Sequence, residues 1–174
     1  RAAGGQQVLL VLDRVVPGIR EIQLRLQFEA AGWHVVQVKY GRRLQEAFAR
    51  PGGERLRDWL DAMPNERYQS LFAVRGAQLR AAFLDGAPSE LAAFLADVAD
   101  DDLAALLTDL GGHDLRAMLD AYAACDAVTD RPSVVFAYTV KGWGLPIAGN
   151  PRNHSALLST EQIAELRAAH GLTE

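Results

Sequence analysis

The run SVVFAYTV at residues 133–140 constrains the fold of this chain more than any other stretch. It is apolar, aromatic and β-branched on both sides, which is typical of a central parallel strand covered on both faces. Residues 6–12 and 33–40 are two further strand candidates, and the amphipathic stretch 19–32 between them predicts a helix. The order strand, helix, strand indicates a parallel crossover. The sequence therefore predicts an α/β fold, a parallel sheet flanked by helices.

Residues 41–110 interrupt this pattern with a series of short segments that have helical spacing. The stretch is too long for a loop in a compact fold, so we interpret it as a helical insertion. Ser89 and one of the residues Asp100–Asp102 are the expected N-caps of two alanine- and leucine-rich helices. Asp114 is the expected N-cap of the helix that follows the insertion.

Composition narrows the function classes. The net charge of −4 argues against a nucleic-acid partner, because sequence-independent binders carry a basic face. No apolar run approaches the ~18 residues of a membrane span, so no membrane partner is expected. The single cysteine, Cys125, excludes a disulfide framework and fits a reducing, cytoplasmic compartment. The start, RAAGGQQ, lacks a methionine and reads as an internal start within a longer chain.

Lys141 follows the buried run directly, at the position where open α/β sheets bind their ligands. Gly142 and Gly144 beside it would let backbone N–H groups approach an anion. The K-G-W-G sequence is not a Walker loop. From the residues alone, Lys141 is either an anion contact or a solvated lysine at the end of a strand.

The other candidate residues are weaker. His154 lies in a polar loop and could act as acid, base or donor, or be an exposed loop histidine. His113 precedes a helix start and is interpreted as a turn residue rather than a site histidine. Cys125 fits a small core residue. The run Asp100–Asp102 fits a solvated first helical turn, and we predict no metal ligand within the chain.

Four motifs in this order resemble the transketolase-like thiamine diphosphate enzymes. They are AAGWHVVQVKYG, LGGHD at a helix start, VVFAYTVKGWG, and a loop ending in Asn153-His154. The resemblance is strongest to the homodimeric pyruvate dehydrogenase decarboxylating subunit and its 2-oxoacid dehydrogenase relatives. The helical stretch 41–110 is similar to an insertion of that subunit that plain transketolases lack. The resemblance extends from about Val8 to Gly171.

This resemblance implies that residues 1–174 are the later part of a thiamine diphosphate-binding domain. It implies thiamine diphosphate and Mg²⁺ as cofactors, a 2-oxoacid substrate, a lipoyl-bearing acyltransferase as acyl acceptor, and a homodimer. Lys141 and Gly142 match the family's residues near the diphosphate. His154 matches a catalytic histidine that takes part in acyl transfer, and residues 141–158 match a mobile loop that closes over the cofactor.

The chain also departs from the family pattern. The magnesium motif of the family begins with G-D-G and ends with an asparagine after a strand, and neither part is present. The sequence passes from Leu12 straight to Asp13, as if several residues were skipped, so most Mg²⁺ ligands are expected outside this chain. We expect the fragment alone to be inactive. The alternatives are a non-catalytic α/β interaction module that keeps the fold without the cofactor, or a transketolase-type enzyme. A Leu12–Asp13 Cα distance much larger than the ~3.8 Å of a trans peptide would mean that residues are missing between them and would refute a deleted loop.

Overall fold

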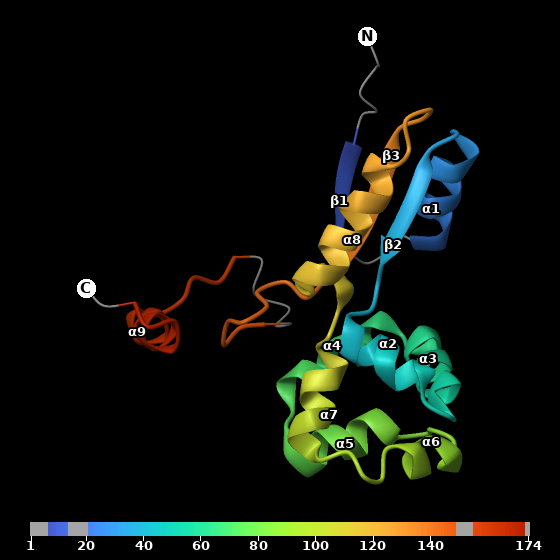
Figure 1. The fold of residues 1–174 in the computed structure, drawn as a ribbon. Helices are drawn as coiled ribbons and strands as arrows, with labels where there is room; N and C mark the ends of the chain where they lie inside the picture. Colours follow the sequence, from blue (N-terminus) through green and yellow to red (C-terminus); the bar gives the residue numbers. More distant parts are fainter. Residues whose placement is uncertain (1–6, 14–20, 149–154, 173–174) are drawn as a thin grey trace.

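The computed structural model describes residues 7–13, 21–148 and 155–172. These residues form an α/β region and, beyond the ends of its strands, a group of short helices (Figure 1). The α/β region contains the strands and the helices α1 (Glu21–Ala30) and α8 (Leu115–Asp126). We call the group of short helices, residues 42–107, the helical module.

Within the described residues, the sheet consists of three parallel strands in the order β1-β3-β2. They are β1 (Gln7–Asp13), β2 (His34–Val38) and β3 (Ser133–Thr139). Gln7 and His34 both lie opposite Ser133, so the strands are aligned and their carboxyl ends meet at one edge. The predicted α/β fold is confirmed, and the run at 133–140 forms the central strand.

Side chains of β3 alternate between two buried faces. Val135 packs with Ala121 and Cys125 of α8, whereas Phe136 belongs to the cluster on the α1 side. Phe136 meets the ring of Phe28 edge to face, with centroids 5.8 Å apart. Since a helix covers each face, a strand with no polar side chain facing water is the stable choice at this position.

The helical module has a hydrophobic core of its own, which includes Leu56, Phe83 and Leu103. Its helices are α2 (Arg42–Ala49), α3 (Gly53–Ala62), α4 (Asn65–Ser70), η1 (Leu71–Ala73), α5 (Gly76–Leu84), α6 (Ser89–Phe94) and α7 (Asp100–Leu107). The chain enters and leaves the module through two adjacent antiparallel segments. Tyr40 forms a bridge with Leu110, and the Gly41 N–H donates to the Asp109 carbonyl at 2.8 Å.

Two of the expected N-caps are wrong. The N-cap of α6 is Pro88 rather than Ser89, and the N-cap of α7 is Ala99 rather than one of the following aspartates, and neither makes a side-chain cap bond. Each predicted capping residue lies inside the first turn instead. There Asp100 forms an ion pair with Arg80 of α5 at 2.5 Å, so its carboxylate joins two helices rather than closing one.

The expected cap at Asp114 is confirmed. Ser159 and Gln162 form a capping box at the start of α9 (Thr160–Ala169). Helix α9 follows the polar loop and extends away from both regions (Figure 1). None of its residues is buried. No helix in the described ranges has both the length and the apolar character that crossing a membrane requires.

Strand β1 runs without a break through Leu12 and Asp13, which lie opposite Tyr138 and Thr139. Both residues therefore belong to this one strand. The expected asparagine of the magnesium motif does not follow this strand in the sequence. Residues 14–20, which come next, lie outside the described residues.

Candidate functional site

The candidate site lies at the edge where the strands end, around a turn formed by residues 111–114, which we call the GGHD turn. Its first part is the short helix η2 (Gly111–His113). A Cβ on Gly111 would lie 2.5 Å from the Val38 carbonyl oxygen, and one on Gly112 would lie 2.6 Å from that of Tyr138. Only glycine allows this approach, so the turn is pressed against the ends of β2 and β3.

His113 connects this turn to the segment that follows β3. Its Nε2 accepts a hydrogen bond from the Val140 N–H at 2.7 Å. Its ring stacks on Trp143, with centroids 4.6 Å apart and planes 12° from parallel. Because Nε2 accepts, it carries no proton, and the neutral ring must hold its proton on Nδ1. Burial lowers the pKa of His113 below 6.5, which favours the same neutral form.

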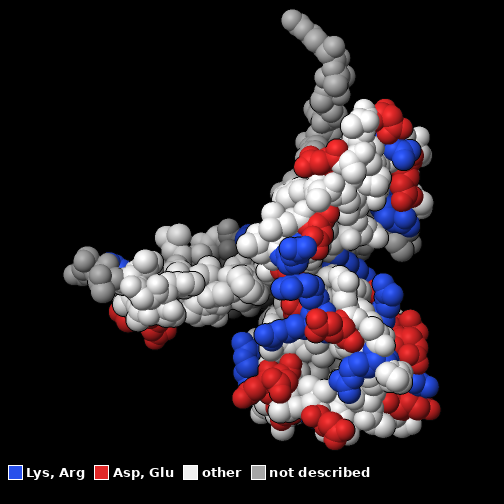
Figure 2. All heavy atoms as spheres, viewed as in Figure 1, with Lys and Arg blue, Asp and Glu red and all other residues white. Residues whose placement is uncertain are grey.

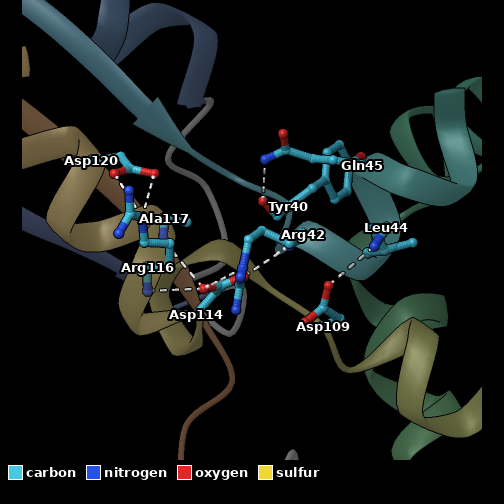
Figure 3. A network of polar contacts seen from close by, with 9 residues as sticks. All are labelled: Tyr40, Arg42, Leu44, Gln45, Asp109, Asp114, Arg116, Ala117 and Asp120. Atoms are coloured by element: carbon cyan, nitrogen blue, oxygen red, sulfur yellow. Dashed lines mark hydrogen bonds and ion pairs between the residues drawn. The ribbon is translucent and has the colours of Figure 1, made fainter.

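Asp114 joins the two regions of the molecule through one carboxylate (Figure 3). Its Oδ1 accepts from the N–H groups of Arg116 at 3.0 Å and Ala117 at 3.2 Å, which caps α8. Its Oδ2 accepts from the backbone N–H of Arg42 at 2.9 Å and from the Arg42 Nε at 3.0 Å. Burial raises the pKa of Asp114, but these hydrogen bonds and the Arg42 charge outweigh it and leave the pKa below 3.8.

A second carboxylate completes the start of α2. Asp109 Oδ2 accepts from the Leu44 N–H at 3.1 Å, two residues after the Arg42 N–H that Asp114 accepts (Figure 3). N–H groups in the first turn of a helix have no partner within the helix. Asp109 and Asp114 supply two of those partners from the chain that leaves the helical module. The module is thus fastened to the α/β region by polar contacts as well as by the Tyr40 bridge.

A pocket of about 540 Å³ opens beside these contacts of Asp109 and Asp114 with the start of α2. Its walls carry both charges and an aromatic surface, from Arg42, Arg43 and Glu46 of α2, Thr108 after α7, and the stacked rings of His113 and Trp143. Basic side chains gather at this junction in Figure 2, whereas both signs are interspersed over the helical module. The pocket therefore suits a polar group better than an apolar ligand.

Lys141 lies close to where the sequence predicts it, two residues past the end of β3, and is half-buried. We call residues 141–144 the KGWG turn. The Trp143 N–H donates to the Val140 carbonyl at 3.0 Å, and Gly142 has a φ of 71°, which favours glycine. Residues 141–144 thus form a turn that depends on glycine. Cofactor contact by Lys141 and Gly142 stays a prediction.

His154, the predicted catalytic residue, lies outside the described residues. The predicted mobile loop 141–158 is described for residues 141–148 and 155–158. The closing motion of this loop and the role of His154 stay predictions.

The sequence interpretation missed the partnership of His113 with Trp143. His113 is indeed a turn residue, but its ring also holds the KGWG turn. A signal was present, because an aromatic residue stands two positions after Lys141. That signal pointed to no partner, since the two rings come from segments far apart in the chain.

The remaining candidates are Cys125 and the side chains that could hold a metal ion. Cys125 is buried beside Val38 and Val135, and burial raises the pKa of its thiol, which confirms a small core residue. In the described part of the chain, no group of three or more His, Cys, Asp or Glu side chains is placed to hold a metal ion.

Comparison with known proteins points to one family. Residues 103–174 match the family described as "Transketolase, thiamine diphosphate binding domain". The chain is also similar to two proteins named pyruvate dehydrogenase E1 component. The one from Cupriavidus necator is 34% identical over 145 residues, which cover 82% of this chain and 16% of that protein. The one from Escherichia coli K12 is 31% identical over 144 residues, again 82% and 16%. This chain thus spans about 16% of the length of these relatives.

Proposed function

We propose that this chain is part of a thiamine diphosphate-dependent 2-oxoacid dehydrogenase subunit. The matches confirm its resemblance to transketolase-like pyruvate dehydrogenase E1 components. One observation supports this most. The matched segment 103–174 contains both the GGHD turn and the KGWG turn, which pack together at the carboxyl edge of a parallel sheet. That edge is where such sheets bind phosphate-bearing ligands.

In this proposal the diphosphate lies against the KGWG turn. Lys141 places a compact positive charge at the strand end, and Gly142 lets a backbone N–H approach the anion. When bound, thiamine diphosphate supplies the carbanion chemistry of decarboxylation. The contribution of this chain is to bind and orient the diphosphate. Mg²⁺ ligands are proposed to lie outside the described residues, because those residues form no metal cluster.

The partners follow from the same proposal. The substrate is a pyruvate-like 2-oxoacid, and the acyl group passes to a lipoyl-bearing acyltransferase. His154 takes part in that transfer, because an imidazole in a polar loop exchanges protons near neutral pH. A homodimer in the cytoplasm completes the proposal. The homodimer is what the family resemblance implies, and the single buried cysteine fits a reducing compartment.

Replacing Lys141 tests the diphosphate contact. We expect Lys141→Ala in the intact protein to weaken thiamine diphosphate binding, measured calorimetrically with excess Mg²⁺, by about 10- to 100-fold, since a hydrogen bond to a charged group contributes ~1.5–3 kcal/mol. Lys39→Ala is the matched control. Lys39 follows the neighbouring strand, but its Nζ is bound to Asp61 of α3. Equal affinity in the wild type and the Lys141 variant would refute the contact. His154→Ala should spare decarboxylation and slow acyl transfer, and equal losses in both steps would contradict its assignment.

A second candidate is a non-catalytic module that keeps the fold without the cofactor. The sequence after β1 favours it, because the asparagine that the family resemblance leads us to expect there is not present. The calorimetric experiment decides between the two. An intact wild-type protein that does not bind thiamine diphosphate with Mg²⁺ would establish the second candidate and refute the first.

A further inference from the structure

We propose that His113 is a positioning residue that holds the KGWG turn in place through a hydrogen bond and a ring stack, and that the hydrogen bond forms only while the imidazole is neutral. The link to cofactor binding rests on the proposed function, because it is Lys141 in this turn that would meet the diphosphate. The hold on the turn itself is independent of any ligand. It follows from contacts that His113 makes on both sides of Lys141.

The two contacts of His113 bracket the lysine. Before it, Nε2 accepts the N–H of Val140, a residue that is 6% exposed. After it, the ring covers one face of Trp143, whose residue is otherwise 55% exposed. Trp143 closes the turn through its N–H to the Val140 carbonyl at 3.0 Å. A displacement of Lys141 and Gly142 would therefore have to break a hydrogen bond, a ring stack, or both.

The support behind the histidine is rigid. Gly111 and Gly112 touch the backbone of β2 and β3, so the turn cannot move without separating from the sheet. Asp114, the next residue, is fixed by N–H groups from both α8 and α2. Because the backbone of the GGHD turn is held in this way, the His113 ring has a defined position relative to the residues that it contacts. His113 is thus held in position by the sheet and by Asp114, and it restrains the KGWG turn through its two contacts.

Protonation would remove one of the two contacts. With a proton on Nε2, the ring could no longer accept from Val140, and two N–H groups would face each other at 2.7 Å. The charged groups beside His113 in the pocket are of both signs: Arg42, Arg43 and Glu46 of α2, Asp109 after α7, and the neighbouring Asp114. Stacking on Trp143 favours an imidazolium ring. Burial opposes it and lowers the pKa of His113. The direction is therefore toward a neutral ring at pH 7 and release of the Val140 contact on acidification.

Two substitutions at His113 separate the two contacts. His113→Gln places an uncharged acceptor the same number of bonds from the backbone, so it should keep the Val140 hydrogen bond and lose the stack. His113→Phe keeps a flat ring for Trp143 and removes the acceptor. Hydrogen–deuterium exchange in the peptide covering Val140, followed in the intact protein at pH 7, reports the first contact. We expect about tenfold faster exchange in the Phe variant than in the wild type or the Gln variant, the factor for one lost hydrogen bond of about 1.4 kcal/mol.

Emission from Trp143 reports the second contact. The signal is the difference in fluorescence between the intact protein and its Trp143→Phe variant. An imidazolium ring in contact with indole quenches it, so this difference should fall on acidification with a midpoint below 6.5. The acid transition should be absent in both His113 variants. A transition that persists in either variant, a midpoint at or above 6.5, or equal exchange at Val140 in all three proteins would overturn the proposal.

The cofactor part has a separate readout. Thiamine diphosphate affinity with excess Mg²⁺ should fall about tenfold in His113→Phe and change little in His113→Gln. If the wild-type protein does not bind this cofactor, the proposed function fails while the exchange and fluorescence results still decide the role of His113. If it binds and both variants bind equally well, the positioning role toward the cofactor is refuted and the proposed function stands.

Discussion

Replacing Asp114 by alanine should destabilise this protein far more than replacing any exposed acid on the same helix. The Asp114 side chain is 8% exposed, and its two oxygens serve different helices. Oδ1 caps α8 through Arg116 and Ala117, and Oδ2 binds the backbone and side chain of Arg42 at the start of α2. The alanine variant loses both functions at once.

The expected magnitude follows from these contacts. Loss of an N-cap costs about 1 kcal/mol. Loss of a charge-assisted bond to a backbone N–H costs ~1.5–3 kcal/mol. The ion pair with the Arg42 side chain, which is 64% exposed, adds less than about 1 kcal/mol. The free energy of unfolding should therefore fall by about 3 kcal/mol, equivalent to a decrease in Tm of roughly 6–12 °C for a chain of this size.

Thermal unfolding followed by circular dichroism provides the measurement. Asp114→Asn can satisfy only one helix, because its amide N–H would face the Arg42 donors, so about half of the loss is expected. Asp120→Ala is the matched control, since Asp120 pairs with Arg116 at an exposed site and should cost less than about 0.5 kcal/mol. An Asp114→Ala variant as stable as the Asp120 control would refute the reasoning.

The contribution of Asp114 also sets a pH dependence. Its pKa in the folded state lies below the ordinary value of 3.8, so the unfolded chain takes up the proton first on acidification. The stabilisation is thus fully present above pH 3.8 and is lost as the pH falls through the lower folded value. The difference in stability between wild type and Asp114→Ala should shrink over that range.

Two further predictions concern packing and the helical module. Gly112→Ala should destabilise the fold by about 3 kcal/mol in urea unfolding, because the new Cβ would lie 2.6 Å from the Tyr138 carbonyl oxygen. Gly86→Ala is the control and should cost only about 1 kcal/mol, because Gly86 has a positive φ but open space around it. Equal losses of stability in the two variants would contradict the close approach at Gly112. Arg80→Ala should lower the free energy of unfolding by about 2–3 kcal/mol, because Arg80 binds Asp100 and the carbonyl oxygens of Leu95 and Val98. If Arg116→Ala, at an exposed site, lowers it by as much, the Arg80 contacts do not stabilise the module.

The sequence by itself determined the parts of the fold that depend on local chemistry. The apolar run at 133–140 specified a central strand, because a strand with no polar side can be buried on both faces. Asp114 was predictable as a cap, since the N–H groups of its own helix that it binds lie within the next three residues. Lys141 was placed at the sheet edge because it follows the strand directly.

Only the tertiary structure decided which partner a side chain binds when both a local and a distant contact are open to it. Asp100 could have capped its own helix, yet it pairs with Arg80 because another helix brings a guanidinium within reach. Asp114 serves its own helix and also α2, which no local pattern reveals. The stack of His113 on Trp143 arises because the glycines of the GGHD turn let one backbone lie against the ends of β2 and β3. Such contacts depend on how distant segments pack, so residue type and spacing along the chain do not encode them.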